Sequence, residues 1–170
     1  MNQVIGFHNP DEEYGEFSNW YMSDFYIGGE KYNCVEQYMM ERKAAMFVDT
    51  EIRSAIMRSS DPAEMKKLGR SVVGFDEHEW DMKKNSIVLD ALLAKFYQNI
   101  PLSHLLQSTR GNILAECSVN DTVWGIGLKM GDKNIQNIMK WKGENRLGFL
   151  LMTVREALLA GRHPIITGAY

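Results

Sequence analysis

The sequence predicts a mainly α-helical fold: a single compact domain over residues 1–170 with a small β-hairpin element near its N-terminus. Helix-start signals follow one another between residues 33 and 79, and apolar residues recur at helical spacing in two long segments. A Gly-Gly pair near the N-terminus lies between two short β-prone runs. The length of 170 residues fits one domain. We expect the core over about residues 5–160 and a tail over residues 161–170.

The hairpin is predicted over residues 24–32. Asp24-Phe25-Tyr26-Ile27 and Lys31-Tyr32 flank Gly28-Gly29. Paired glycines supply the positive φ angles of a tight hairpin turn, so we expect two short antiparallel strands here.

Four helices are predicted between residues 33 and 98. Asn33 followed three residues later by Glu36 has capping-box spacing, which predicts a helix through about Phe47. The second helix is expected from about Thr50 to Arg58. The third follows the cap Asp61 and Pro62 and ends at Gly69, and the fourth follows the cap Asp76 and runs to about Gln98.

Sequence signals between residues 101 and 161 predict three shorter helices and a long loop. Pro101 begins a short helix, and residues 117–131, rich in Gly, Asn and Asp, form the loop. Asp132 is expected to cap a short helix to Trp141. Asn145 is expected to cap the last helix, which Gly161 ends.

Composition and charge argue against several classes of protein. The formal net charge is −3, whereas extended duplex binding needs many Lys and Arg contacts to phosphates. No segment reaches the roughly 20 apolar residues of a membrane span, and the N-terminus lacks the pattern of a signal peptide. Cys34 and Cys117 lack CxxC spacing. We therefore expect a cytoplasmic protein with reduced thiols and no membrane partner, and the sequence predicts no particular oligomeric state.

The common enzyme motifs are missing from the sequence. It contains no GxxxxGK[ST] phosphate loop, no HExxH, no GxSxG and no Cys/His cluster for zinc. The four histidines are scattered. Neither a metal site nor a histidine-based catalytic triad is therefore expected.

One predicted helix face carries a candidate catalytic pair. Glu36, Met40 and Lys43 lie on one face because seven residues make about two helical turns. Glu36 has two interpretations, a capping-box residue or a catalytic carboxylate. Lys43 is either a solvated helix residue or a phosphate ligand.

The segment from Asp121 to Gly127 is the most informative loop. Trp124 lies between turn-forming residues and precedes Gly125, so an aromatic platform and close backbone approach to a ligand are both possible here. The alternative is a turn whose Trp fills the core. Four further residues also have a structural and a functional interpretation: Arg70 and Arg146 as surface or anion-binding groups, Trp80 as a core or pocket residue, and Glu116 as a strand end or a buried carboxylate.

Seven segments in order resemble the NADAR family, also called YbiA-like. They are Phe17-Ser18-Asn19-Trp20, Val35-Glu36-Gln37-Tyr38 with Lys43, Leu68-Gly69-Arg70, Trp80 with Ala94-Lys95-Phe96, Leu114-Ala115-Glu116-Cys117-Ser118, Asp121 with Trp124-Gly125-Ile126-Gly127, and Asn145-Arg146-Leu147-Gly148 with Leu151-Met152. The resemblance covers roughly residues 5–160. Gln37, Glu41 and Trp20 depart from the residues usual in the family, which bears on substrate preference.

The resemblance implies a mainly α fold and hydrolysis of an N-glycosidic bond without metal or cofactor. The family acts on early riboflavin-pathway intermediates that carry ribose phosphate, or on ADP-ribosylated guanine. Matching positions make Glu36 and Asp121 the acidic catalytic residues. The substrate-binding set would be Asn19, Lys43, Arg70, Trp80, Glu116, Trp124, Gly125 and Arg146.

The charges that develop during cleavage of the N-glycosidic bond support acidic catalytic residues. Cleavage of a C1′–N bond develops a cationic sugar and negative charge on the leaving base, so a carboxylate near C1′ and a donor near the base both lower the barrier. We expect Glu36, Asp121 and Trp124 to converge on one cleft that also presents positive groups. The alternative is a non-catalytic module that binds ADP-ribose or a nucleotide.

Overall fold

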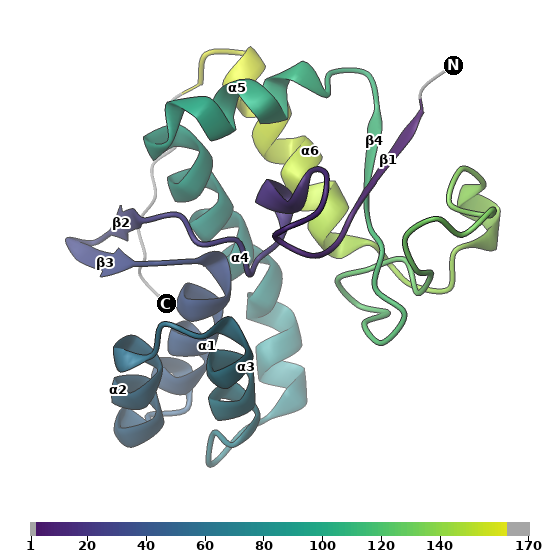
Figure 1. The fold of residues 1–170 in the computed structure, drawn as a ribbon. Coiled ribbons are helices and arrows are strands. Elements are labelled where there is room, and N and C mark those ends of the chain that lie inside the picture. Colours follow the sequence, from purple (N-terminus) through teal and green to yellow (C-terminus); the bar gives the residue numbers. More distant parts are fainter. Residues whose placement is uncertain (1–2, 163–170) are drawn as a thin grey trace. The chain divides into compact units, whose positions relative to one another are not determined.

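The computed structural model describes residues 3–162, which form two compact units (Figure 1). One unit comprises residues 22–99, and the other comprises residues 3–21 and 100–162. Residues 22–99 are mainly helical, the other unit combines two α-helices with long loops, and each unit contains one two-stranded sheet. Six α-helices over the described residues 3–162 confirm the predicted, mainly α fold class. The predicted tail lies outside the described residues from residue 163 onward. That the whole chain forms one domain stays a prediction.

The unit of residues 22–99 begins with the expected hairpin. Strands β2 (Phe25–Ile27) and β3 (Glu30–Tyr32) pair antiparallel, and Gly28 and Gly29 have φ angles of 61° and 83°. Four helices follow: α1 (Val35–Met46), α2 (Thr50–Arg58), α3 (Pro62–Arg70) and α4 (Glu77–Gln98). Helix α1 packs against the other three, and most of its residues are buried (Figure 1).

The start of α1 corrects the predicted cap. Cys34, not Asn33, is the N-cap, and its Sγ accepts a hydrogen bond from the Gln37 amide at 3.4 Å. The Gln37 side chain accepts from the Asn33 amide at 2.9 Å, so Gln37 makes the return bond that the sequence assigned to Glu36. The Asn33 side chain instead donates to the carbonyl of Ser59. The helix therefore begins one residue later, and Glu36 has no capping-box role.

Gly69 does not end α3, contrary to the prediction. The helix continues to Arg70 and is capped by Ser71, whose amide donates to the Leu68 carbonyl. A Cβ atom at position 69 would lie 2.0 Å from the Met40 sulfur and also 2.9 Å from Met40 Cγ and 3.2 Å from Met40 Cβ, atoms that cannot easily move away. Gly69 is therefore needed for close packing of α3 on α1, not for a chain reversal.

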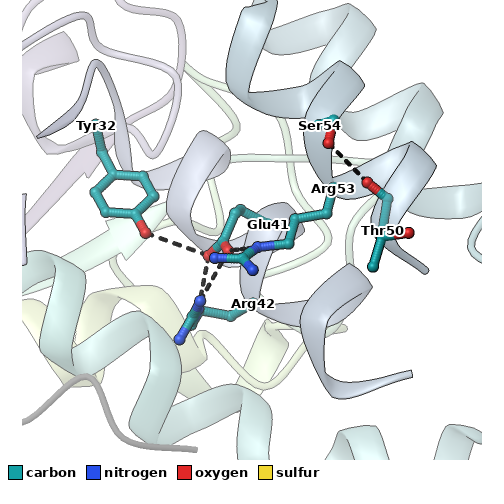
Figure 2. A network of polar contacts seen from close by, with 6 residues as sticks. All are labelled: Tyr32, Glu41, Arg42, Thr50, Arg53 and Ser54. Carbon is teal, nitrogen blue, oxygen red and sulfur yellow. Dashed lines mark hydrogen bonds and ion pairs between the residues drawn. The ribbon is translucent and has the colours of Figure 1, made fainter. Parts of the chain in front are cut away.

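A buried ionic cluster joins α1, α2 and β3 (Figure 2). The Glu41 side chain is fully buried and accepts hydrogen bonds from Arg42 at 2.6 and 2.7 Å, from Arg53 at 2.5 Å and from the Tyr32 hydroxyl at 3.3 Å. Burial alone would raise the pKa of Glu41, but the two guanidinium groups outweigh it and hold the pKa below its ordinary value. The carboxylate thus stays charged inside the unit.

The unit of residues 3–21 and 100–162 is built around two parallel strands, β1 (Val4–Phe7) and β4 (Ile113–Glu116). Its helices are α5 (Ile100–Ser108) and α6 (Arg146–Leu159), with short 3-10 helices η1 (Gly15–Phe17) and η2 (Ile138–Lys140). Helix α6 packs on β4 and α5 (Figure 1). Part of the core is a cluster to which the predicted loop contributes: Val4, Ala115, Cys117, Ile126, Leu128 and Ile135.

The helix expected from Asp132 to Trp141 is absent. The Asp132 carboxylate accepts from the Asn134 amide at 2.8 Å, which forms a turn rather than a helix cap. The Gln136 side chain bonds to the amide and carbonyl of Val4, and the Trp141 indole donates to the Ile135 carbonyl. These contacts hold the segment in turns, and only η2 remains helical. Across residues 3–162, no helix combines the length and the apolar character of a membrane span.

Replacing Glu41 is expected to destabilise the protein. In Glu41→Gln, two guanidinium groups lose their buried counter-ion, and the expected cost is roughly 3 kcal/mol because an uncompensated charge remains. Urea denaturation measures it. The control is Asp24→Asn, since Asp24 and Lys31 form an ion pair in which both side chains are exposed, and it should leave the free energy of unfolding nearly unchanged. Equal effects of the two substitutions would contradict the role of the cluster.

The raised pKa of the Cys34 thiol predicts that the protein loses stability at alkaline pH. Burial raises the thiol pKa from 9.0 to about 11. The folded protein therefore keeps the proton that the unfolded chain loses, and this stabilisation is present below pH 9 and lost as pH rises toward 11. Between about pH 8 and about pH 10, the wild type should lose about 1 kcal/mol more unfolding free energy than Cys34→Ser. Parallel pH dependence of the two proteins would rule this out.

Candidate functional site

The Glu36 carboxylate lies in the first turn of α1 and is only 3% exposed. Its charge acts on the neighbouring Cys34 thiol, whose pKa is raised first by burial and further by Glu36. Lys95 acts on the same thiol with the opposite sign. The side chains of Glu36 and Lys95 therefore both lie near the Cys34 thiol at the start of α1.

Lys95 is a candidate that the sequence analysis did not select. Its side chain on α4 is fully buried, and its ammonium lies 5.4 Å from the Phe96 ring centroid. A fully buried lysine is exceptional, and buried titratable groups gather at functional sites. The available signal was its position: Lys95 follows Ala91 and Leu92 by four and three residues, so it lies on the apolar face of the helix.

Lys43 is surrounded by aromatic and cationic groups. Its ammonium lies 3.9 Å from the Phe75 ring centroid and 5.9 Å from that of Trp80. The residue is 9% exposed, and its pKa is lowered first by burial and then by the charge of Arg70. Three residues that the sequence selected, Lys43, Arg70 and Trp80, are thus brought together. Phe75 was missed, although an aromatic residue just before the helix cap Asp76 was visible in the sequence.

Asp121 shapes the loop that carries Trp124. Its Oδ1 atom accepts hydrogen bonds from the amides of Val123 at 3.2 Å and Trp124 at 2.9 Å. This is the turn that an aspartate makes with its own backbone. Asp121 therefore orients Trp124, and its catalytic role stays a prediction.

Asn145 holds the predicted residues of this unit together. It is the N-cap residue of α6, as expected, although its side chain makes no capping hydrogen bond. Instead, its Oδ1 accepts from the Glu116 amide at 3.0 Å and its Nδ2 donates to the Leu114 carbonyl at 2.8 Å. Its backbone amide donates to the Gly125 carbonyl at 3.1 Å. The end of β4 and the loop around Gly125 are therefore pinned to the start of α6.

Gly125 is required by crowding within the loop. A Cβ atom there would lie 2.8 Å from the backbone carbonyl oxygens of both Asp121 and Glu116. Real Cβ atoms do not approach oxygen so closely. The glycine is therefore explained by local packing, and its predicted contact with substrate stays a prediction.

The start of α6 does not offer all its amides to an anion, contrary to one interpretation of the sequence. The amides of Arg146 and Leu147 donate to the carbonyls of Val123 and Trp124, each at 3.2 Å. The Arg146 guanidinium pairs with the exposed Glu144 at 2.6 Å. The amides of Arg146 and Leu147 are therefore already occupied within the loop and are not available to a phosphate.

Asn19 lies in the segment of residues 3–21 and is buried. Its side-chain oxygen has no hydrogen-bond partner among the residues that the structure describes. A buried polar atom is normally satisfied, so this acceptor is available to a ligand or to water.

The predicted site residues are divided between the two units. Glu36, Lys43, Arg70 and Trp80 belong to residues 22–99, and Asn19, Glu116, Asp121, Trp124, Gly125 and Arg146 belong to the other unit. That both groups act on one substrate stays a prediction. Among residues 3–162, no three His, Cys, Asp or Glu side chains are arranged to hold a metal ion.

An open pocket of about 310 Å³ lies elsewhere, beside the Glu41 cluster. It is lined by Glu30, Thr50, Arg53, Ser54 and Met57, of which Thr50, Arg53 and Ser54 are drawn in Figure 2. None of the predicted site residues lines it, so this pocket is not the predicted site.

Several known proteins are similar to this chain in sequence, and one solved structure is similar in fold. A family model described as NADAR domain matches residues 6–159. N-glycosidase R617 of Acanthamoeba polyphaga mimivirus is 39% identical over 145 residues, which are 82% of this chain and 85% of that protein. N-glycosidase YbiA of Escherichia coli is 33% identical over 158 residues, 93% of this chain and 90% of that protein. The NMR structure of the E. coli protein YbiA matches with a TM-score of 0.78 and covers 95% of this chain and 88% of that one.

Two further relatives are longer than the matched region. The chain spans 61% of the length of Protein irg-1 of Caenorhabditis elegans, with 38% identity over 130 residues. It spans 39% of Riboflavin biosynthesis protein VVA0006 of Vibrio vulnificus, with 32% identity over 158 residues.

The family match confirms the resemblance found from seven short segments, because it covers all of them. Relatives that align over most of their own length carry the activity in their names, which decides against a module that only binds nucleotides. The chain therefore belongs to the NADAR domain family and is an N-glycosidase, a hydrolase that cleaves N-glycosidic bonds.

Proposed function

We propose that the substrate is a nitrogen base joined through C1′ to a phosphorylated or ADP-linked ribose, and that Glu36 is the ionised carboxylate that acts at C1′. The observation that carries this proposal is the burial of Glu36 without the capping role that the sequence assigned to it. Burying a carboxylate costs free energy, and the helix cap does not explain this burial. Because buried titratable groups gather at functional sites, we assign Glu36 a catalytic role.

The reaction needs charge stabilisation at two places. As the C1′–N bond breaks, its electron pair leaves with the base and the ribose becomes cationic. Water then forms the new C1′–O bond, and one of its protons ends on the base. An ionised Glu36 would stabilise the cation or accept the proton of the attacking water. In this proposal Glu36 is ionised when substrate is bound, and its place in the first turn of α1 puts the carboxylate at the positive end of the helix dipole.

Lys43 and Arg70 are proposed to bind the phosphate. No carboxylate pairs with Lys43 within residues 22–99 of the described structure, and the nearby charge of Arg70 disfavours its ammonium. Two cations that repel each other both gain when a phosphate dianion lies between them. Phosphate binding far from the reacting bond would align C1′ with Glu36, which lies two helical turns from Lys43 on α1.

The base is proposed to meet the loop of residues 121–125. Trp124 would provide the stacking platform, and Asp121 would be the second carboxylate, acting near the leaving base. Support comes from the Asx turn, which orients Trp124, and from Asn145, which fixes the same loop to α6. Asn19, Glu116, Gly125 and Arg146 are proposed as further substrate contacts.

Two substrate classes fit this chemistry, ribosylamino-pyrimidine phosphates and ADP-ribosylated guanine. The name of VVA0006 refers to riboflavin biosynthesis, which supports the first class. Mass spectrometry of purified protein with both substrates should detect release of a free base from at least one of them. Intact substrate in both reactions would contradict the proposed substrate class.

Glu36→Gln tests the catalytic carboxylate. It preserves shape and hydrogen bonding but removes the charge, so we expect kcat to fall by roughly 10²–10⁴-fold with little change in melting temperature. Steady-state kinetics and thermal unfolding measure both. Glu51→Gln is the matched control because Glu51 also lies in the first turn of a helix, α2, and is exposed. A large loss of stability with retained turnover would show that Glu36 is structural.

Asp121 requires two substitutions, since its loop role and its catalytic role overlap. Asp121→Asn keeps an Oδ1 acceptor for the amides of Val123 and Trp124 but removes the charge, whereas Asp121→Ala removes both. If Asp121 is catalytic, both variants should lose kcat by at least roughly 10²-fold. Near wild-type turnover in Asp121→Asn, with loss only in Asp121→Ala, would restrict Asp121 to orienting the loop.

A further inference from the structure

We propose that Phe75 is a positioning residue whose ring holds the Lys43 ammonium and thereby sets the affinity for the phosphate end of the substrate. The inference rests on the proposed function, in which Lys43 binds that phosphate. Phe75 is not among the residues that the family resemblance selected.

The first observation is where the Lys43 ammonium lies. Long lysine side chains on a helix usually bury their methylene groups and extend the charged end into water. Here the residue is 9% exposed, and the ammonium lies 3.9 Å from the centre of the Phe75 ring. That distance is well within the range of an attractive cation–π contact. Trp80, at 5.9 Å, is at the outer edge of the same range.

The second observation is how Phe75 is held in place. Its ring packs edge-on against Phe47, with centroids 5.4 Å apart and an interplanar angle of 74°. The loop before it is tied to α2, because the Val73 amide donates to the Asp49 carboxylate at 3.0 Å. The ring position is therefore determined by contacts other than Lys43. Phe75 is nevertheless 42% exposed, which is unusual for an aromatic side chain that serves only to fill a core.

The choice of an aromatic partner has an electrostatic consequence. A carboxylate beside Lys43 would neutralise the ammonium and compete with an incoming phosphate. An aromatic ring compensates part of the lost hydration but leaves the positive charge in place. With Arg70 close enough to lower the pKa of Lys43, the pair offers two charges to one anion. Phe75 thus keeps Lys43 in place without neutralising its charge.

The test compares Phe75→Leu, which keeps an apolar side chain but removes the ring face, with Phe75→Tyr, which restores it. Ribose 5-phosphate is the probe, and its dissociation constant is measured by calorimetry, so turnover is not required. We expect binding about 3- to 10-fold weaker in Phe75→Leu and close to wild type in Phe75→Tyr. Phe149→Leu is the matched control, since Phe149 is an exposed phenylalanine on α6, and it should leave binding unchanged.

A double-mutant cycle shows whether the effect passes through Lys43. In a Lys43→Met background, Phe75→Leu should cause no further loss of binding. In proton NMR spectra, the Lys43 Cε protons should be shifted upfield by the ring in wild type, and the shift should disappear in Phe75→Leu. Additive losses, an unchanged dissociation constant in Phe75→Leu, or an upfield shift that persists in that variant would each overturn the proposal.

Kinetics separates this inference from the proposed function. For a phosphorylated ribosyl base, Phe75→Leu should raise KM and leave kcat nearly unchanged, because the ring acts on binding and not on bond cleavage. A fall in kcat at unchanged KM would overturn the positioning role. Failure of the wild-type enzyme to release any base would instead count against the proposed substrate, while the binding and NMR results would still decide the role of Phe75.

Discussion

The burial of α1 is the constraint on which the unit of residues 22–99 depends. The helix packs against α2, α3 and α4 and still carries three ionisable side chains in buried positions, Glu36, Glu41 and Lys43. Charges removed from water must be compensated inside the protein or they destabilise it. The three residues are compensated in different ways, and these differences separate structural from functional groups.

Glu41 is fully compensated, because two guanidinium groups and a tyrosine hydroxyl surround it. The Glu41 carboxylate therefore stabilises the fold, and both of its oxygens already accept hydrogen bonds from within the protein. Lys43 meets aromatic rings and a second cation instead of an anion, so its charge remains available. Glu36 lies at the positive end of the helix dipole. The charges of Glu36 and Lys95 both act on the Cys34 thiol, with opposite signs. The proposed function follows from this contrast.

In the unit of residues 3–21 and 100–162, most of the predicted site residues lie on a long loop rather than on a buried helix. Loops hold side chains precisely only when their backbone is tied to rigid elements. Here Asp121 orients its own loop, and Asn145 connects that loop to β4 and α6 through both its side chain and its backbone. Asn145 is therefore a structural support of the predicted base platform.

Local sequence signals predicted most of the helices and the hairpin correctly, because caps, prolines and glycine pairs act within a few residues. They failed where distant contacts decide the outcome. The parallel pairing of β1 with β4 joins segments far apart in the chain, and Gly69 is explained only by Met40 on another helix. Lys43, Arg70 and Trp80 were selected through the family resemblance. Phe75 and Lys95 have only weak local signals in the sequence, and their burial and ring contacts distinguish them.

A crystal structure of Glu36→Gln bound to an uncleaved phosphorylated ribosyl base would test most directly whether Glu36 acts at C1′. We expect C1′ to lie in contact with the side chain at position 36 and the phosphate to contact Lys43 and Arg70. A substrate bound with C1′ remote from position 36, for example in the pocket beside Arg53, would contradict it.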